Sequence, residues 1–406
     1  MIVLPAAIQQ FQVPLIVLNN ILALGLKPGI TRIVLTLPTL VILVLQSYYK
    51  REPGYFNDEY PTNCMIMALA FMYVNWILLA TPDRKRWHKI RYGKDGKQDG
   101  SISDRSNDSK VQYDDVPQSF WERVWWGARL ATSNRYVGWS QQAKNVRMEV
   151  SSDYPRWLFL VRKSLRAALF YLLKDAIYAY SASLPYGNWR GANNGKILSS
   201  TEGIPWNHRF VISWVYIVLT YVVLELYNLF YGIAAVATGL SNPRDCPSMF
   251  GDLAEMVTIR KCWSVVWHQQ LRRICSDPAI WLARDILHLR KGSFASKYLQ
   301  LYLGFFISAL IHAVPTAMIL HSWKDANTLP VFMAQALMIM VEDHVIDLGK
   351  SAGLRESVFW RIVGHAWTIT WFGLSTAPYA AKVVGYGQFV HEKTPDFFGI
   401  GPSFQG

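Results

Sequence analysis

The chain has 406 residues, with 41 Lys or Arg against 28 Asp or Glu, so its net charge is +13. It is 51% apolar and only 17% charged, whereas soluble domains average about 25% charged residues. This composition excludes a disordered chain and an ordinary water-soluble enzyme. Four cysteines without a C-x-x-C pair exclude a disulfide-rich secreted domain. The basic residues lie between apolar runs, which favours a membrane over nucleic acid as the partner.

Eight apolar segments are long enough to cross a bilayer, which takes about 20 residues each. In chain order they are residues 6–26, 30–49, 63–80, 157–184, 209–240, 297–320, 329–348 and 358–380. The fourth carries several cations near its start, so we expect its first turns in the interfacial layer. The predicted fold is all-α, a polytopic membrane bundle of about eight transmembrane helices.

The loops between these segments differ in charge, and the difference predicts the orientation. The loops on one side, chiefly residues 81–156 and 241–297, hold most of the 41 cations. The positive-inside rule makes that side cytosolic. With no targeting signal besides the spans, we expect a multi-pass protein of the endoplasmic reticulum.

Composition divides the chain into three parts. Residues 1–80 form N-terminal transmembrane helices, residues 81–156 a cytosolic segment and residues 157–406 the core. Within the cytosolic segment, residues 93–116 contain almost no apolar side chains, which predicts a disordered insert. In the core, apolar residues recur at spacings of three and four over residues 250–274, which predicts an amphipathic helix on the cytosolic membrane face.

Polar residues inside the spans are the first candidates for function, because a charge at the bilayer centre costs about 3 kcal/mol. His312 lies about 14 residues, or ~21 Å, from the cytosolic end of its span. It can bond to a neighbouring helix or carry out chemistry, and the pattern leaves both alternatives open. His268, in WSVVWHQQLRR, would by itself be an ordinary interfacial histidine.

Acidic residues raise two further alternatives. The D-x-x-x-D spacing of Asp343 and Asp347 could hold Mg²⁺ and a diphosphate, as in membrane prenyltransferases, but no other span offers the second Asp-rich cluster. Glu225, Glu342 and Asp343 could protonate a substrate in a membrane terpene cyclase, although Glu225 is expected to pair with a neighbouring donor. We predict no metal site. A transporter would often show paired repeats with broken helices, and none is visible.

Two stretches resemble the wax synthase-like family of the membrane-bound O-acyltransferase superfamily. NPRDCPSMFGDLAEMVTIRKCWSVVWHQQLRR is similar to that family's cytosolic segment, where W-H-Q or W-N precedes the histidine span. GFFISALIHAV is similar to its F-x-x-S-G-x-x-H span, with Ala309 where glycine is usual. NRYVGWSQQAKNV is a weaker match to the R-G-x-G-W stretch of the fungal branch. That branch contains acetyltransferases acting on terpenoid and meroterpenoid alcohols.

The resemblance implies an enzyme that transfers an acetyl group from acetyl-CoA, as a co-substrate with no bound cofactor, to a hydroxyl of such a hydrophobic metabolite. It implies that His312 is the general base and that burial keeps this ring neutral. His268 then polarises the thioester carbonyl or orients the acyl group. A wax-ester-type long-chain acyltransferase and a terpene cyclase remain the alternatives.

The same resemblance, together with the charge of coenzyme A, gives a set of substrate-binding residues. They are Arg244, Arg260, Lys261, Arg272, Arg273 and Ser308. Anionic lipid headgroups are the alternative partners of these cations. Bulky Phe305, Phe306 and Trp371 suggest a short acyl pocket.

Overall fold

The computed structural model describes residues 3–49, 56–90, 116–183, 204–323 and 328–389. Within these ranges the chain forms helices, turns and one isolated backbone bridge, between Lys89 and Trp139. The all-α prediction is therefore confirmed. The predicted insert, residues 93–116, lies outside the described residues except for Val116.

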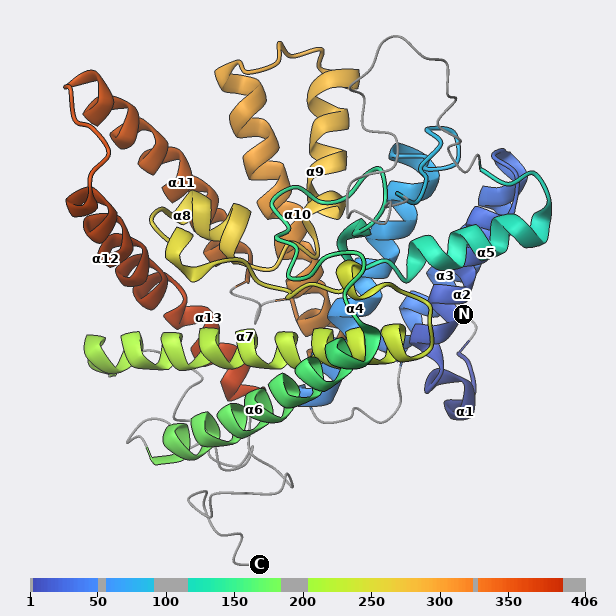
Figure 1. Ribbon diagram of the computed structural model, residues 1–406, viewed down its shortest axis with the longest axis horizontal. Coiled ribbons are helices and arrows are strands. Elements are labelled where there is room, and N and C mark those ends of the chain that lie inside the picture. Colours follow the sequence, from blue (N-terminus) through green and yellow to red (C-terminus); the bar gives the residue numbers. More distant parts are fainter. Residues whose placement is uncertain (1–2, 50–55, 91–115, 184–203, 324–327, 390–406) are drawn as a thin grey trace, which may run out of the picture.

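The helices succeed one another along the colour gradient of Figure 1. They are α1 (Ala6–Gln9), α2 (Gln12–Gly25), α3 (Ile30–Tyr49), α4 (Phe56–Val74), α5 (Phe120–Ala131), α6 (Arg156–Ser183), α7 (Trp206–Ala237), α8 (Ile259–Lys261), α9 (Arg272–Trp281), α10 (Phe294–Leu320), α11 (Thr328–Ser351), α12 (Val358–Ser375) and α13 (Ala377–Gly385). Short π- or 3-10-helical turns lie between them: η1 (Asn75–Leu79), η2 (Asn134–Tyr136), η4 (Pro243–Asp245), η5 (Leu253–Glu255), η6 (Cys262–Val266) and η7 (Leu282–Ile286).

Five helices of the described residues are long and apolar enough to cross a membrane: α3, α4 with η1, α7, α10 and α11. A polytopic membrane protein is thereby confirmed, with fewer such helices than the eight predicted spans. Helices also form at the other three predicted spans. However, α2 has 14 residues, α6 carries several cations, and α12 has 18 residues that include Arg361 and His365. None of these three combines the length and apolar content of a simple span.

Two sets of helices cross at a wide angle in Figure 1. The green helices α6 and α7 pack along each other, and α4 and α10 stand nearly upright above them in that view. α10 packs against α4 on one side and α11 on the other, while α12 and α13 return the chain to α7. α10 therefore contacts both the N-terminal and the C-terminal parts of the chain.

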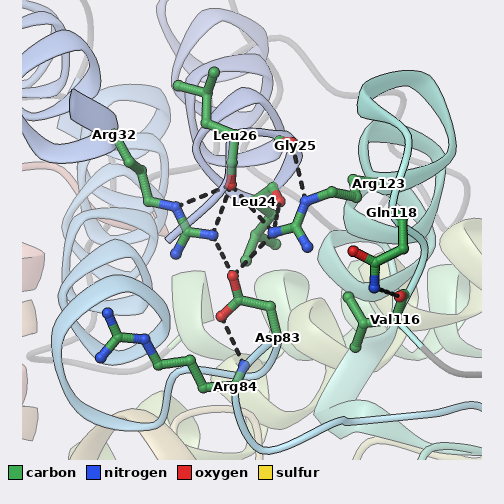
Figure 2. Close-up of polar contacts among 9 residues, drawn as sticks. All are labelled: Leu24, Gly25, Leu26, Arg32, Asp83, Arg84, Val116, Gln118 and Arg123. Atoms are coloured by element: carbon green, nitrogen blue, oxygen red, sulfur yellow. Dashed lines mark hydrogen bonds and ion pairs between the residues drawn. The ribbon is translucent and has the colours of Figure 1, made fainter. Parts of the chain in front are cut away.

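A buried charge cluster ties the end of α2 to the segment after α4 (Figure 2). Asp83 forms ion pairs with Arg32 and with Arg123, the latter at 2.9 Å, and the side chain of Asp83 is only 1% exposed. Both guanidinium groups also donate to the terminal carbonyls of α2, those of Leu24, Gly25 and Leu26, at 2.8–3.2 Å. The last carbonyls of a helix have no partners within it, so the cluster satisfies them and fixes α5 against α2.

The prediction of one amphipathic helix over residues 250–274 is wrong. The segment instead forms η5, α8 and η6, and Trp267 in extended conformation (φ −69°, ψ 152°) ends η6. Its apolar side chains Ile259, Cys262 and Val266 are buried against α11 and α12. The spacing of three and four therefore does not correspond to one helix on a membrane surface.

Replacing Asp83 with Asn should destabilise the protein, because two buried guanidinium groups would lose their shared carboxylate. Removing one partner of a buried ion pair costs about 3–5 kcal/mol. We expect a clear fall in the Tm of the detergent-solubilised protein. Asp153→Asn, at an exposed carboxylate, is the matched control and should leave the Tm unchanged. Equal Tm values for the two variants would contradict the role of the cluster.

Candidate active site

His312 lies in the middle of α10, and its own helix sets its tautomer. Its Nδ1 is 2.7 Å from the backbone carbonyl oxygen of Ser308, one turn earlier. Since a carbonyl oxygen can only accept, Nδ1 carries the proton, and in the neutral ring Nε2 keeps its lone pair. Nε2 is therefore the nitrogen able to take a proton from a substrate. Ser308, predicted as a substrate contact, acts here through its backbone.

His268 follows the extended Trp267 and is enclosed by aromatic rings. The ring centroids of Trp267 and Phe250 lie 5.6 and 5.9 Å from that of His268. Its Nδ1 is buried and has no hydrogen-bond partner among the described residues. Burial lowers the pKa of His268 from 6.5 to about 3, and repulsion from protonated His312 and from Arg135 adds to the shift. The ring is therefore neutral at physiological pH.

The structure brings the segments that carry the two predicted histidines together, because the ring of Trp263 contacts both Trp267 and Phe332. An aromatic cluster lies between the two segments that carry them. It consists of Trp263, Trp267, Phe305, Phe332 and Phe372. Trp267 contacts His268, and Phe332 contacts His312 at 5.1 Å between ring centroids.

Gln269 and Arg272 fix the turn that presents His268. The buried amide of Gln269 donates to the backbone carbonyls of Trp263 and Trp267, at 3.0 and 2.6 Å. Arg272 in turn donates to Gln269 Oε1 at 2.7 Å and to the carbonyl of Ser264 at 2.9 Å. Arg272, predicted to bind the acyl donor, is thus engaged in holding this turn.

Glu342 and Asp343 hold the start of α8. Glu342 accepts from the backbone N–H groups of Ile259 and Arg260 at 2.9 and 3.1 Å, and from Trp367 Nε1 at 3.1 Å. The two carboxylate oxygens of Asp343 accept hydrogen bonds from Nε and Nη2 of Arg260, at 2.7 and 2.6 Å. Both carboxylates are therefore engaged with protein donors. No cluster of His, Cys, Asp or Glu in the described ranges is arranged to hold a metal ion.

The other cations that were predicted to bind the acyl donor also lie beside polar groups of the protein. Lys261 pairs with Glu255 at 2.7 Å. Arg273 donates to the backbone of Gln141 at 3.1 Å and pairs with Asp277 at 3.3 Å. Arg244 lies in η4 beside Asp245, whose pKa is raised mainly by burial. Arg260 and Arg272 therefore hold parts of the segment that leads to His268, while Arg273 ties α9 to Gln141.

Arg135 is an important residue that the sequence analysis did not single out. Its buried guanidinium group donates to three consecutive carbonyls, those of Pro247, Ser248 and Met249, at 2.8–3.1 Å. Two carboxylates bind the N–H groups of the same loop: Glu225 accepts from Met249 at 2.8 Å, which confirms its expected pairing, and Glu149 accepts from Ser248 at 3.0 Å. In the sequence, the one sign of a role for this arginine was its place in the stretch NRYVGW, which resembles a motif of the fungal branch. These bonds place Phe250 against His268.

Comparisons with known proteins address the same region. The family model described as membrane bound O-acyl transferase family matches residues 246–334, a stretch that includes both histidines. Acetyltransferase sirH of Leptosphaeria maculans is 42% identical over 395 residues, which is 97% of this chain and 95% of that protein. Acetyltransferase ple2 of Rhodocybe pseudopiperita is 32% identical over 66% of this chain and 69% of its own length.

Acetyltransferase eriL of Hericium erinaceus is 30% identical over 63% of this chain and 65% of its own length. No solved structure matches the chain. The near-complete overlap with a 42% identical acetyltransferase agrees with the family match around the two histidines. The chain therefore belongs to the membrane-bound O-acyltransferase family and is an acyltransferase enzyme.

Proposed function

We propose that the protein transfers an acetyl group from acetyl-CoA to a hydroxyl of a hydrophobic secondary metabolite, of the terpenoid or meroterpenoid class. The observation that carries this proposal is the bond from His312 Nδ1 to the Ser308 carbonyl. It leaves Nε2 as a proton acceptor on a membrane helix, which is what activation of an alcohol requires.

The reaction needs one base and one group that acts on the thioester. His312 Nε2 takes the hydroxyl proton while the alcohol oxygen bonds to the carbonyl carbon of the thioester. The carbon–sulfur bond then breaks, and the coenzyme A sulfur receives the proton back from His312. His268, which is neutral, polarises the carbonyl or orients the acyl group. No covalent acyl-enzyme forms in this sequence.

Both substrates suit an enzyme embedded in a membrane. An apolar alcohol can reach α10 laterally from the lipid, whereas the anionic donor enters from the side that is rich in cations, which we take to be the cytosolic face of the endoplasmic reticulum. The acyl chain is proposed to be short, since several relatives are named acetyltransferases. Phe305 lies in the aromatic cluster and Trp371 beside it, but Phe306 is 38% exposed and does not belong to that cluster.

Replacing His312 with Ala should abolish ester formation. Loss of a general base typically lowers the rate by about 10²–10⁴-fold, and we expect a fall in kcat within that range. The assay incubates membranes with labelled acetyl-CoA and a hydroxylated terpenoid and measures the ester, with palmitoyl-CoA as the competing donor.

His365→Ala is the matched control, because His365 lies on α12 and takes part in none of the contacts described for the site. It should retain wild-type turnover and membrane insertion. Near wild-type turnover by His312→Ala would refute the mechanism. Isomerisation of the terpenoid without acetyl-CoA would favour a cyclase, and preference for palmitoyl-CoA would favour a wax-ester-type enzyme.

Stability should fall as the pH drops below about 6.5, and His268 should account for part of the loss. Its pKa is about 3 in the folded protein and 6.5 without the fold. Between these values the unfolded chain binds a proton that the folded chain does not, so acid favours unfolding. The slope for one group is at most about 1.4 kcal/mol per pH unit.

The measurement compares the Tm of the solubilised protein at pH 7 and pH 5. The fall in Tm from pH 7 to pH 5 should be larger for wild type than for His268→Asn, which has no titrating ring at this position. His288→Asn, at an exposed histidine, should behave as wild type. An identical pH response of His268→Asn and wild type would show that the ring is not held neutral by burial.

A further inference from the structure

The indole nitrogen of Trp263 is a buried donor without a partner. Its Nε1 is enclosed by protein and has no hydrogen-bond acceptor among the described residues. Two other indoles packed on the same cluster are paired: Trp214 donates to the carbonyl of Ile369 at 3.2 Å, and Trp371 donates to Gln335 Oε1 at 2.8 Å. Buried donors are almost always paired, because an unpaired one has given up its hydration without compensation. An unpaired donor at Trp263, in the cluster that joins the two histidine segments, therefore points to an acceptor that arrives with a ligand.

The ring of Trp263 contacts a neighbour of each histidine. Its ring is 5.9 Å from that of Trp267, which contacts His268, and 6.2 Å from that of Phe332, which contacts His312. Its backbone carbonyl is held by Gln269 at 3.0 Å. The indole is thus fixed between the immediate neighbours of the two histidines.

We propose that Trp263 Nε1–H donates a hydrogen bond to the carbonyl oxygen of the acyl thioester. This inference rests on the proposed acyl transfer. An indole N–H can only donate, whereas the hydroxyl of the alcohol needs an acceptor for its proton, and His312 Nε2 supplies one. The thioester oxygen is the reacting atom that needs a donor.

The bond strengthens as the reaction proceeds. When the alcohol oxygen attacks, the carbonyl electron pair moves onto that oxygen, which becomes an oxyanion. When the carbon–sulfur bond breaks, the pair returns to form the ester carbonyl, and the charge passes to sulfur, which takes the proton from His312. A donor already aimed at the oxygen stabilises the charged stage more than the ground state. The surrounding rings exclude water, so the bond is stronger than it would be in solution.

Trp263→Phe removes the N–H and keeps an aromatic ring in its place. We expect kcat for acetyl transfer to fall about 100-fold, the size found when one oxyanion donor is lost, with a much smaller change in KM. The Tm should fall only by the cost of the lost ring volume, since the variant breaks no hydrogen bond within the protein. Trp214→Phe is the matched control: it breaks a protein–protein hydrogen bond, so its Tm should fall while its kcat stays near wild type.

Two inhibitors identify the atom that is bound. A ketone analogue of acetyl-CoA, with CH₂ in place of sulfur, keeps the carbonyl, whereas S-ethyl-CoA lacks it. Wild type should bind the ketone more tightly, and Trp263→Phe should lose most of that preference while binding S-ethyl-CoA as before.

Wild-type kcat in Trp263→Phe, or an equal loss of affinity for both analogues, would overturn the inference. A fall in the Tm of Trp263→Phe as large as that of Trp214→Phe would also overturn it, because the N–H would then have a protein partner. If wild type forms no ester from acetyl-CoA, the proposed function itself fails, which is a separate result.

Discussion

Irregular backbone inside a helical membrane protein needs a partner for each of its polar groups, and this requirement determines how the site is built. Where lipid or packed side chains exclude water, unpaired N–H and C=O groups are costly. Residues 246–269 run through the bundle largely without regular helix. Charged side chains therefore take over the role of the missing helical hydrogen bonds: Arg135 binds three carbonyls, while Glu225 and Glu342 bind N–H groups.

The same bonds place the candidate catalytic groups. The Arg135 and Glu225 contacts fix the loop that carries Phe250, and Phe250 packs against His268. Glu342 fixes the start of α8, from which η6 and its terminal Trp267 follow. His312 comes instead from a regular helix, where its own preceding turn orients the ring. One histidine is thus positioned by tertiary contacts and the other by helix geometry.

Several charged residues that the sequence offers as ligands for a substrate instead form hydrogen bonds or ion pairs within the protein. Arg260 is held by Asp343, Arg272 by Gln269, and Asp83 joins two arginines. This assigns several of the 41 Lys and Arg residues to internal contacts and leaves a smaller set for donor binding. It also weakens the cyclase alternative, because Glu225, Glu342 and Asp343 already accept bonds from protein donors.

The sequence alone determined the membrane class, the all-α fold and the approximate position of every long helix, because apolar content and length are local properties. Its resemblance to the wax synthase-like family singled out His268 and His312, since each lies in a stretch similar to a motif of that family. Only the tertiary structure decided that residues 250–274 form several short helical segments rather than one helix, that Arg135 is central, and that the indole of Trp263 has no partner among the described residues. These features depend largely on contacts between segments far apart in the chain, such as Arg135 with Ser248 and Glu342 with Ile259, and spacing along one segment carries no information about them.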